Sequence, residues 1–201
     1  MDKDFINKHR MVDHAIDPIY INRWSSRAFK DKYVPKDVLY RLFEAARWAP
    51  SANNVQPWRF IVAQEEKDRE KFLTFINKGN ITWCQHAPVL VAVISHTKWV
   101  EDGRDINPTN AFDTGTAWGF LALEATRQGL VAHGMGGFNR EKAKETLNIP
   151  DDYDIHAIIA IGYRGDLFNL PADLQAREKP SNRKNIKEFT YEGTFAQPLK
   201  E

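Results

Sequence analysis

The chain has 201 residues, of which 42% are apolar and 27% charged, and its formal net charge is +1. These values are typical of an ordinary globular chain of one domain, and the neutral balance gives no electrostatic argument for nucleic acid or a membrane surface as a partner. The single cysteine, Cys84, excludes an internal disulfide and is most simply a small buried residue. We expect a cytoplasmic protein, because the N-terminus is charged and no apolar run reaches membrane-spanning length.

The first half of the chain predicts alternating helices and strands. Apolar residues recur at helical spacing from Val38 to Ala49, and Pro50 ends this helix. We then expect a short strand at 58–63 and an amphipathic helix at 65–79. The run at 88–95 (PVLVAVIS) is nearly all β-branched or apolar, which is typical of a strand covered on both faces.

The second half continues the pattern. Residues 110–128 have apolar side chains around the whole circumference, so we expect a central, largely buried helix. Within it, Gly115 and Gly119 would let another helix approach closely, and Gly129 suits its C-terminal cap. A glycine-rich turn at 134–137 should precede a short helix capped by Asn139, and the last buried strand should be 155–163.

This order of elements predicts an α+β fold with helices packed on one sheet. We expect residues 1–201 to form a single domain, with 165–201 as an extended C-terminal arm. From Arg164 onward there are too few apolar residues for a core. The arm is therefore mobile, docks on its own chain, or docks on a second subunit.

A basic segment near the N-terminus suits a phosphate. Arg23, Ser25, Ser26 and Arg27 place two guanidinium groups and two hydroxyls in what reads as a single turn. Arg183 and Lys184 in the arm could close over the same anion. Each group alone is more simply a solvated surface charge.

The loop from Pro50 to Trp58 (PSANNVQPW) is more specific. Its prolines restrict the backbone, and its Asn and Gln side chains offer both donors and acceptors, which suits the edge of a flat heterocycle. Together with the basic segment, this loop indicates a pocket for a phosphorylated ring such as flavin mononucleotide (FMN). The simpler alternative is that the amides only satisfy backbone groups of the loop.

These motifs occur in a recognisable order: RWSSRAF, LFEAARWAPSANNVQPWRF, GNITWCQHAPVLV, GLVAHGMGGF and an NRK tail. The set, which spans Arg23 to Arg183, resembles the nitroreductase family of FMN-dependent oxidoreductases. The resemblance implies a three-layer α+β fold, with a central, mostly antiparallel sheet flanked by helices. It further implies an intertwined homodimer with two FMN molecules at the interface and the C-terminal arm wrapped around the partner.

The resemblance also assigns roles to residues. The phosphate would be held by Arg23, Ser25, the backbone of Trp24, and Arg183, with Arg27 beside the ribityl chain and pyrimidine. The other subunit would line the flavin with Pro50, Ser51, Ala52 and Asn54, and Gln56 would support that loop. The ring edge would meet Asn80 and the backbone N–H groups of Gly136 and Gly137. Trp83 stands where some members have a lysine, which removes one cation from the flavin's surroundings.

The expected activity is two-electron reduction of nitroaromatics, quinones or related electron-poor small molecules by a ping-pong mechanism, with NAD(P)H as a transient donor. We assign no catalytic side chain and no metal ligand, and no G-x-G-x-x-G motif indicates a dinucleotide domain. Two alternatives stay open: different flavin chemistry, such as dehalogenation or flavin fragmentation, and a non-enzymatic flavin-binding sensor. The segment 98–109 shows no recognisable substrate motif, and a nucleic-acid binder is the least favoured interpretation.

Overall fold

The computed structural model describes residues 3–99 and 106–199. The helices are α1 (Lys3–Asn7), α2 (Pro18–Asn22), α3 (Lys36–Arg47), α4 (Glu66–Leu73), α5 (Lys78–Cys84), α6 (Asn110–Arg127), α7 (Arg140–Thr146) and α8 (Ala172–Gln175), with short 3-10 turns η1 (Ala52–Asn54), η2 (Leu167–Asn169) and η3 (Ile186–Glu188). The strands are β1 (Trp58–Ala63), β2 (Val89–His96), β3 (Leu130–Met135) and β4 (Tyr153–Tyr163). No helix in the described residues is both long and apolar enough to cross a membrane.

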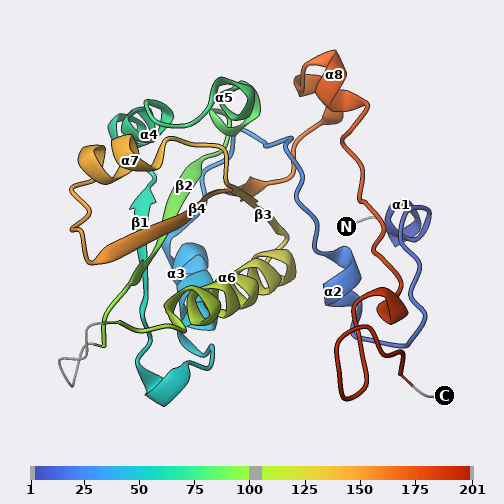
Figure 1. Cartoon of the computed structure of the whole chain (residues 1–201). Helices are drawn as coiled ribbons and strands as arrows, with labels where there is room; N and C mark the ends of the chain where they lie inside the picture. The colour runs from blue at the N-terminus through green and yellow to red at the C-terminus, as the bar shows by residue number, and fades with distance from the viewer. Residues whose placement is uncertain (1–2, 100–105, 200–201) are drawn as a thin grey trace.

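The four strands form one antiparallel sheet in the order β1-β2-β4-β3. Helices α4, α5 and α7 lie on one side of this sheet, and α3 and α6 lie on the other (Figure 1). Strand β2 is buried along almost its whole length because it contributes to both apolar cores. Its side chains at 90, 92 and 94 join the core under α4, α5 and α7, and those at 89, 91 and 93 join the core under α3 and α6. The predicted three-layer α+β fold is therefore confirmed.

The predicted helix at 65–79 is two helices, α4 and α5. The backbone between them pairs with the segment after β3 instead of continuing the helix. The N–H of Asn139 donates to the carbonyl of Phe75 (2.8 Å), and the N–H of Asn77 donates to that of Gly137 (3.0 Å). An isolated bridge joins Ile76 to Phe138. These long-range bonds satisfy backbone groups that a continuous helix would have paired locally.

Strand β3 was also not predicted. The sequence predicted a glycine-rich turn from residue 134, but Gly134 lies within the strand and pairs with Ile159. The chain leaves the sheet after Met135, at Gly136 and Gly137. In contrast, Gly129 has φ +73 after the end of α6, and Asn139 accepts from the N–H of Lys142 (3.0 Å) at the start of α7, so both predicted caps are present.

Helix α6 is buried on one face only. Ala117, Leu121 and Ala125 pack into the core against α3 and the sheet, but Phe112 on the opposite face is 79% exposed. A side chain at Gly115 or Gly119 would meet nothing within 4 Å. The prediction that this helix is largely buried is therefore wrong for the single chain. No other helix in the described part of the chain packs closely against Gly115 or Gly119.

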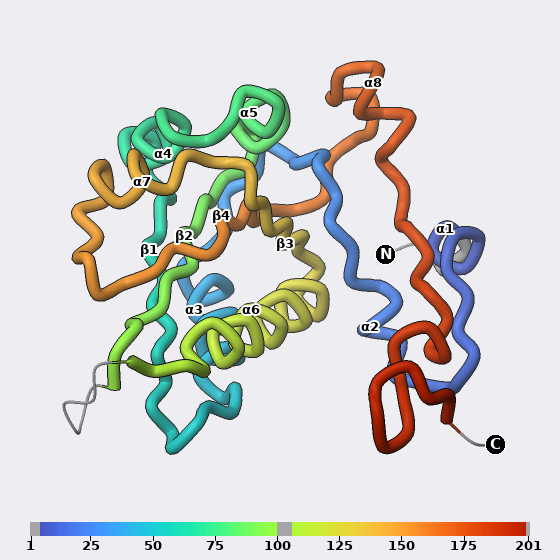
Figure 2. The backbone as a smooth tube through the Cα atoms, in the orientation of Figure 1, coloured from blue at the N-terminus to red at the C-terminus, as the bar shows by residue number. Residues whose placement is uncertain are grey.

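The two ends of the chain lie beside each other, away from the sheet (Figure 2). Hydrogen bonds connect them directly: Arg10 Nε to the Ser181 carbonyl (3.0 Å), Met11 N–H to Asn182 Oδ1 (3.4 Å) and Asn185 Nδ2 to Asp13 Oδ2 (3.2 Å). Of the three alternatives for the arm, these contacts show docking on its own chain. Wrapping of the arm around a partner subunit stays a prediction.

Candidate functional site

The basic segment from Arg23 to Ala28 is extended, so the expected single turn is wrong. Helix α2 starts at Pro18, directly after Asp17, whose carboxylate caps it. The helix ends at Asn22, and the backbone is extended at Arg23. In an extended chain, successive side chains point to opposite sides. Accordingly Arg23, Ser25 and Arg27 are half-exposed, whereas the three residues that alternate with them (24, 26 and 28) are buried. Ser26, considered as a phosphate donor, faces the interior.

A cavity of about 260 Å³ lies beside this segment. Its lining includes Arg23, Trp24, Ser25 and Arg27, together with Arg183 from the arm, so the structure brings the predicted phosphate-binding residues together. Ser181, which flanks the basic pair of the arm, also lines the cavity, and four further lining residues were not predicted: Arg10, His133, Arg177 and Lys179. Six cationic side chains and no carboxylate therefore line one small cavity.

The cations in this cavity repel one another. Burial, followed by the charges of Arg183 and Arg23, lowers the pKa of Arg10 to about 10. Burial and the charge of Arg183 also lower the pKa of Arg23. Both guanidinium groups are still protonated near neutral pH, so the cavity is strongly electropositive. Such a site favours a multivalent anion, which would offset the repulsion.

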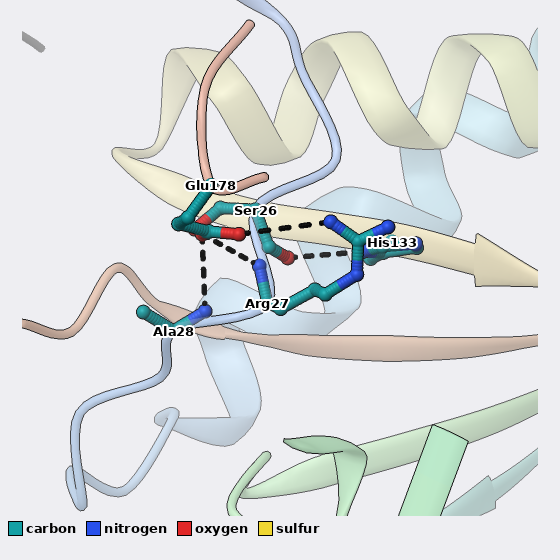
Figure 3. A network of polar contacts seen from close by, with 5 residues as sticks. All are labelled: Ser26, Arg27, Ala28, His133 and Glu178. Atoms are coloured by element: carbon teal, nitrogen blue, oxygen red, sulfur yellow. Dashed lines mark hydrogen bonds and ion pairs between the residues drawn. The ribbon is translucent and has the colours of Figure 1, made fainter. Parts of the chain in front are cut away.

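Glu178, which follows α8, holds the arm against the basic segment (Figure 3). Its Oε1 accepts hydrogen bonds from the Ser26 hydroxyl, from the N–H of Arg27 (2.8 Å) and from the N–H of Ala28 (3.2 Å). Its Oε2 lies 3.8 Å from Nη1 of Arg27. The residue is 6% exposed, so its charge is stabilised by these donors rather than by water.

Arg10, in the N-terminal segment before α2, contacts both the basic segment and the arm. Its guanidinium group donates to the carbonyl oxygens of Ser181 (3.0 Å), Arg23 (2.7 Å) and Ile21. A single buried cation thus connects the N-terminal lead, the basic segment and the arm. No sequence pattern distinguished Arg10 from neighbouring solvated charges.

His133 forms the inner wall of the cavity. Burial is the main reason that its pKa is lowered to about 4, so the ring is neutral near pH 7. Its Nδ1 donates to the carbonyl of Ser26 (3.0 Å). The ring stacks on Trp83, with centroids 4.4 Å apart, and Trp83 is itself 2% exposed. Trp83 is therefore a core residue that supports His133.

Asn80, Gly136 and Gly137 lie together just beyond the C-terminal end of β3. Asn80 Nδ2 donates to the carbonyl of Gly137 (3.1 Å). A Cβ atom on Gly137 would lie 2.7 Å from that nitrogen, so this close approach requires glycine. Gly136 is exposed, with nothing within 4 Å of a Cβ atom built on it. Strand β3 lies at the edge of the sheet. Because a strand rises about 3.3 Å per residue, roughly 10 Å separates His133 from Gly136.

The loop residues Pro50, Ser51, Ala52, Asn54 and Gln56 do not line this cavity. Their loop lies at the bottom of Figure 1, near the start of α6 and far from the arm. The N–H of Ala52 donates to the buried carboxylate of Asp113 (3.1 Å), and the Gln56 amide donates to the carbonyl of Asn54 (3.0 Å). Gln56 thus supports the loop as expected.

The loop backbone is strained. Asn53, Asn54 and Gln56 have φ values of 50, 57 and 52, in the left-handed region that non-glycine residues rarely adopt. Such strain costs of order 1 kcal/mol per residue and is commonly found where a loop must present groups in fixed directions.

Two other chemistries have little support in the described residues. Cys84 is buried, and burial raises the pKa of its thiol to about 12, so it supplies no thiolate. No group of three or more His, Cys, Asp or Glu residues in 3–99 and 106–199 could hold a metal ion. Part of the segment 98–109, to which we assigned no substrate motif, lies outside the described residues.

Comparison with known proteins decides the family. The model of the nitroreductase family matches residues 20–82 and 77–163. The chain belongs to the nitroreductase family. It is therefore an oxidoreductase of a flavin-using family, and the matched residues include Arg23, Arg27, Asn80, Gly136 and Gly137.

Individual relatives agree with this assignment. A protein of Stenotrophomonas maltophilia (strain R551-3) that has the provisional name NADH dehydrogenase/NAD(P)H nitroreductase is 26% identical over 179 residues, which cover 81% of this chain and 91% of that protein. A crystal structure of an oxidoreductase containing FMN is 39% identical, with a TM-score of 0.89, and covers 94% of this chain and 96% of its own. Iodotyrosine deiodinase bound to FMN and 3-iodo-L-tyrosine shares the fold at 22% identity, with a TM-score of 0.65, over 88% of this chain and 98% of its own.

The state of His133 predicts a pH dependence of stability. Its pKa is about 4 in the folded protein and 6.5 when unperturbed, so between these values the unfolded chain binds more protons. The free energy of unfolding should therefore fall as the pH drops from about 6.5 to about 4, by roughly 3 kcal/mol from this residue. Urea denaturation at pH 7 and pH 4.5 would measure this loss.

The matched variant is His133→Asn, which keeps an amide donor for the Ser26 carbonyl but does not titrate. We expect its stability to fall less than that of the wild type over the same pH interval. Equal losses in the two proteins would show that His133 is not held neutral by burial.

Proposed function

We propose that this chain is an FMN-dependent NAD(P)H oxidoreductase that reduces nitroaromatics, quinones or related electron-poor small molecules. The observation that carries the proposal is the cavity beside His133 of β3, with six cationic side chains, two serines and no carboxylate. A phosphate monoester carries close to two negative charges near neutral pH and requires convergent donors of this kind. The crystallised relative that contains FMN supports flavin as the phosphorylated group.

The chain's own residues would hold FMN at two ends. Arg23, Ser25 and Arg183 would bind the phosphate, and Arg27, which also lines the cavity, would lie next along the molecule. Gly136 and Gly137 would meet the ring, because the N–H of Gly137 has no acceptor among the described residues and glycine lets a ligand approach the backbone. FMN, when bound, supplies the two-electron redox chemistry.

The proposal needs no acid or nucleophile from the protein. The ring of His133 is neutral, and its Nδ1 proton is held by the Ser26 carbonyl, so it is not available for transfer there. The residues instead bind, orient and stabilise charge. NAD(P)H and the acceptor would occupy the same space in turn, which gives ping-pong kinetics.

The proposed site is completed by a second copy of the chain. The loop at 50–56 is rigid and lies far from the cavity of its own chain, so its contribution must come from a partner. Helix α6 offers the partner an exposed face with Phe112, Gly115 and Gly119, and α3, which packs against α6, has exposed Tyr40. Exposed large apolar side chains of this kind suit an interface.

An anaerobic titration tests the proposed activity. Purified protein reconstituted with FMN should lose its flavin absorbance on addition of NADH or NADPH and regain it on addition of a nitroaromatic compound or a quinone. Steady-state rates with varied donor and acceptor should give parallel double-reciprocal lines. Bound FMN that neither nucleotide reduces would favour the sensor alternative and contradict the proposed activity.

Mixing two variants tests the shared site. Arg23→Ala and Asn54→Ala should each weaken FMN binding as homodimers. A mixed dimer would contain one site with both substitutions and one site with neither, because the two residues of each site come from different subunits. Unfolding and refolding the variants together should therefore restore one tight FMN site per mixed dimer. No restoration would show that both residues serve the same chain's site. Normal FMN binding by the Asn54→Ala homodimer would show that Asn54 serves none.

A further inference from the structure

The arm supplies much of the cavity but has little core of its own to hold it in place. Arg177, Lys179, Ser181 and Arg183 all line the cavity, yet the short helix before them ends at Gln175. In this stretch Glu178 is buried while Arg177 and Lys179 on either side are exposed. The docking of Glu178 therefore turns its two cationic neighbours toward the cavity.

The partners of Glu178 are the backbone and hydroxyl groups behind the phosphate-binding side chains. Glu178 accepts hydrogen bonds from Ser26, Arg27 and Ala28. In the same extended segment, the side chains of Ser25 and Arg27 line the cavity. A carboxylate thus fixes both halves of the cavity wall without lining the cavity itself.

We infer that Glu178 is a positioning residue for the phosphate group of the cofactor. It clamps the arm on residues 26–28, so the donors of the arm and those of the basic segment converge on one anion. This inference rests on the proposed FMN binding. It assigns Glu178 no contact with the ligand.

The negative charge of Glu178 is required for this role. One oxygen, Oε1, accepts three hydrogen bonds, and charge strengthens each of them. The other oxygen, Oε2, has no hydrogen-bond partner in the described residues and lies near the Arg27 cation. In Glu178→Gln, the amide oxygen is a weaker acceptor, and the amide NH₂ group would sit against Arg27 or against the donors of 26–28.

The experiment compares FMN with riboflavin, which lacks the phosphate. Flavin-free wild type, Glu178→Gln and Glu188→Gln are titrated with each flavin, and the dissociation constants are measured by fluorescence. Glu188 is the matched control because it is an exposed arm glutamate that caps η3 through Asn185 and does not contact the cavity.

We expect Glu178→Gln to raise the Kd for FMN roughly 10-fold to 100-fold, as for loss of a charge-assisted hydrogen bond, and to leave the Kd for riboflavin unchanged. Glu188→Gln should bind both flavins as the wild type does. An equal loss of affinity for both flavins in Glu178→Gln, or no loss, overturns the inference.

Trypsin cleavage after Arg183 and Lys184, which are exposed residues of the arm, gives a second readout in the flavin-free proteins. It should be faster in Glu178→Gln than in Glu188→Gln. If the wild type binds neither flavin, the proposed function fails, but proteolysis still tests whether Glu178 holds the arm on residues 26–28. Equal cleavage rates in the two variants would overturn that role of Glu178.

Discussion

Repulsion among cations gathered around one small cavity is the constraint on which the site depends. Burial, and after it the charges of Arg183 and Arg23, lower the pKa of Arg10 to about 10, so the gathered cations contribute to this lowering. Two buried ions hold the cavity together: Arg10 donates to backbone carbonyls of the basic segment and the arm, and Glu178 accepts from the backbone of the basic segment. The fold thus preorganises a site whose repulsion a bound anion would relieve.

The sheet body positions this site indirectly. Strand β2 is buried on both faces, so the helices on each side are fixed against it, and β3 is left as an edge strand. His133, within β3, lines the cavity, and three residues further along, the chain leaves the strand at Gly136. An elongated ligand with an anionic tip and a flat ring would follow this edge. The loop at 50–56 lies away from the cavity of its own chain. In the proposed dimer it would instead line the flavin bound by the second subunit.

Patterns that depend on local chemistry were predictable from the sequence. The β-branched run at 88–95 indicated a doubly covered strand, and Asn139 indicated a helix cap, because period and capping are properties of neighbouring residues. The break between α4 and α5 was not predictable in this way, because it depends on pairing with residues 137–139, far along the chain. Arg10 and Glu178 were missed for the same reason: each is one charge in a polar segment, and only the folded arm reveals its partners.

The most direct test of the phosphate site is the affinity of Arg23→Ala for FMN, compared with Lys71→Ala, which removes an exposed cation paired with Asp68 on α4. Hydrogen bonds to charged groups are worth about 1.5–3 kcal/mol, so Arg23→Ala should raise the Kd for FMN roughly 10-fold to 100-fold. Lys71→Ala should bind FMN as the wild type does. Equal affinities in all three proteins would contradict the assignment of the cationic cavity to the cofactor's phosphate.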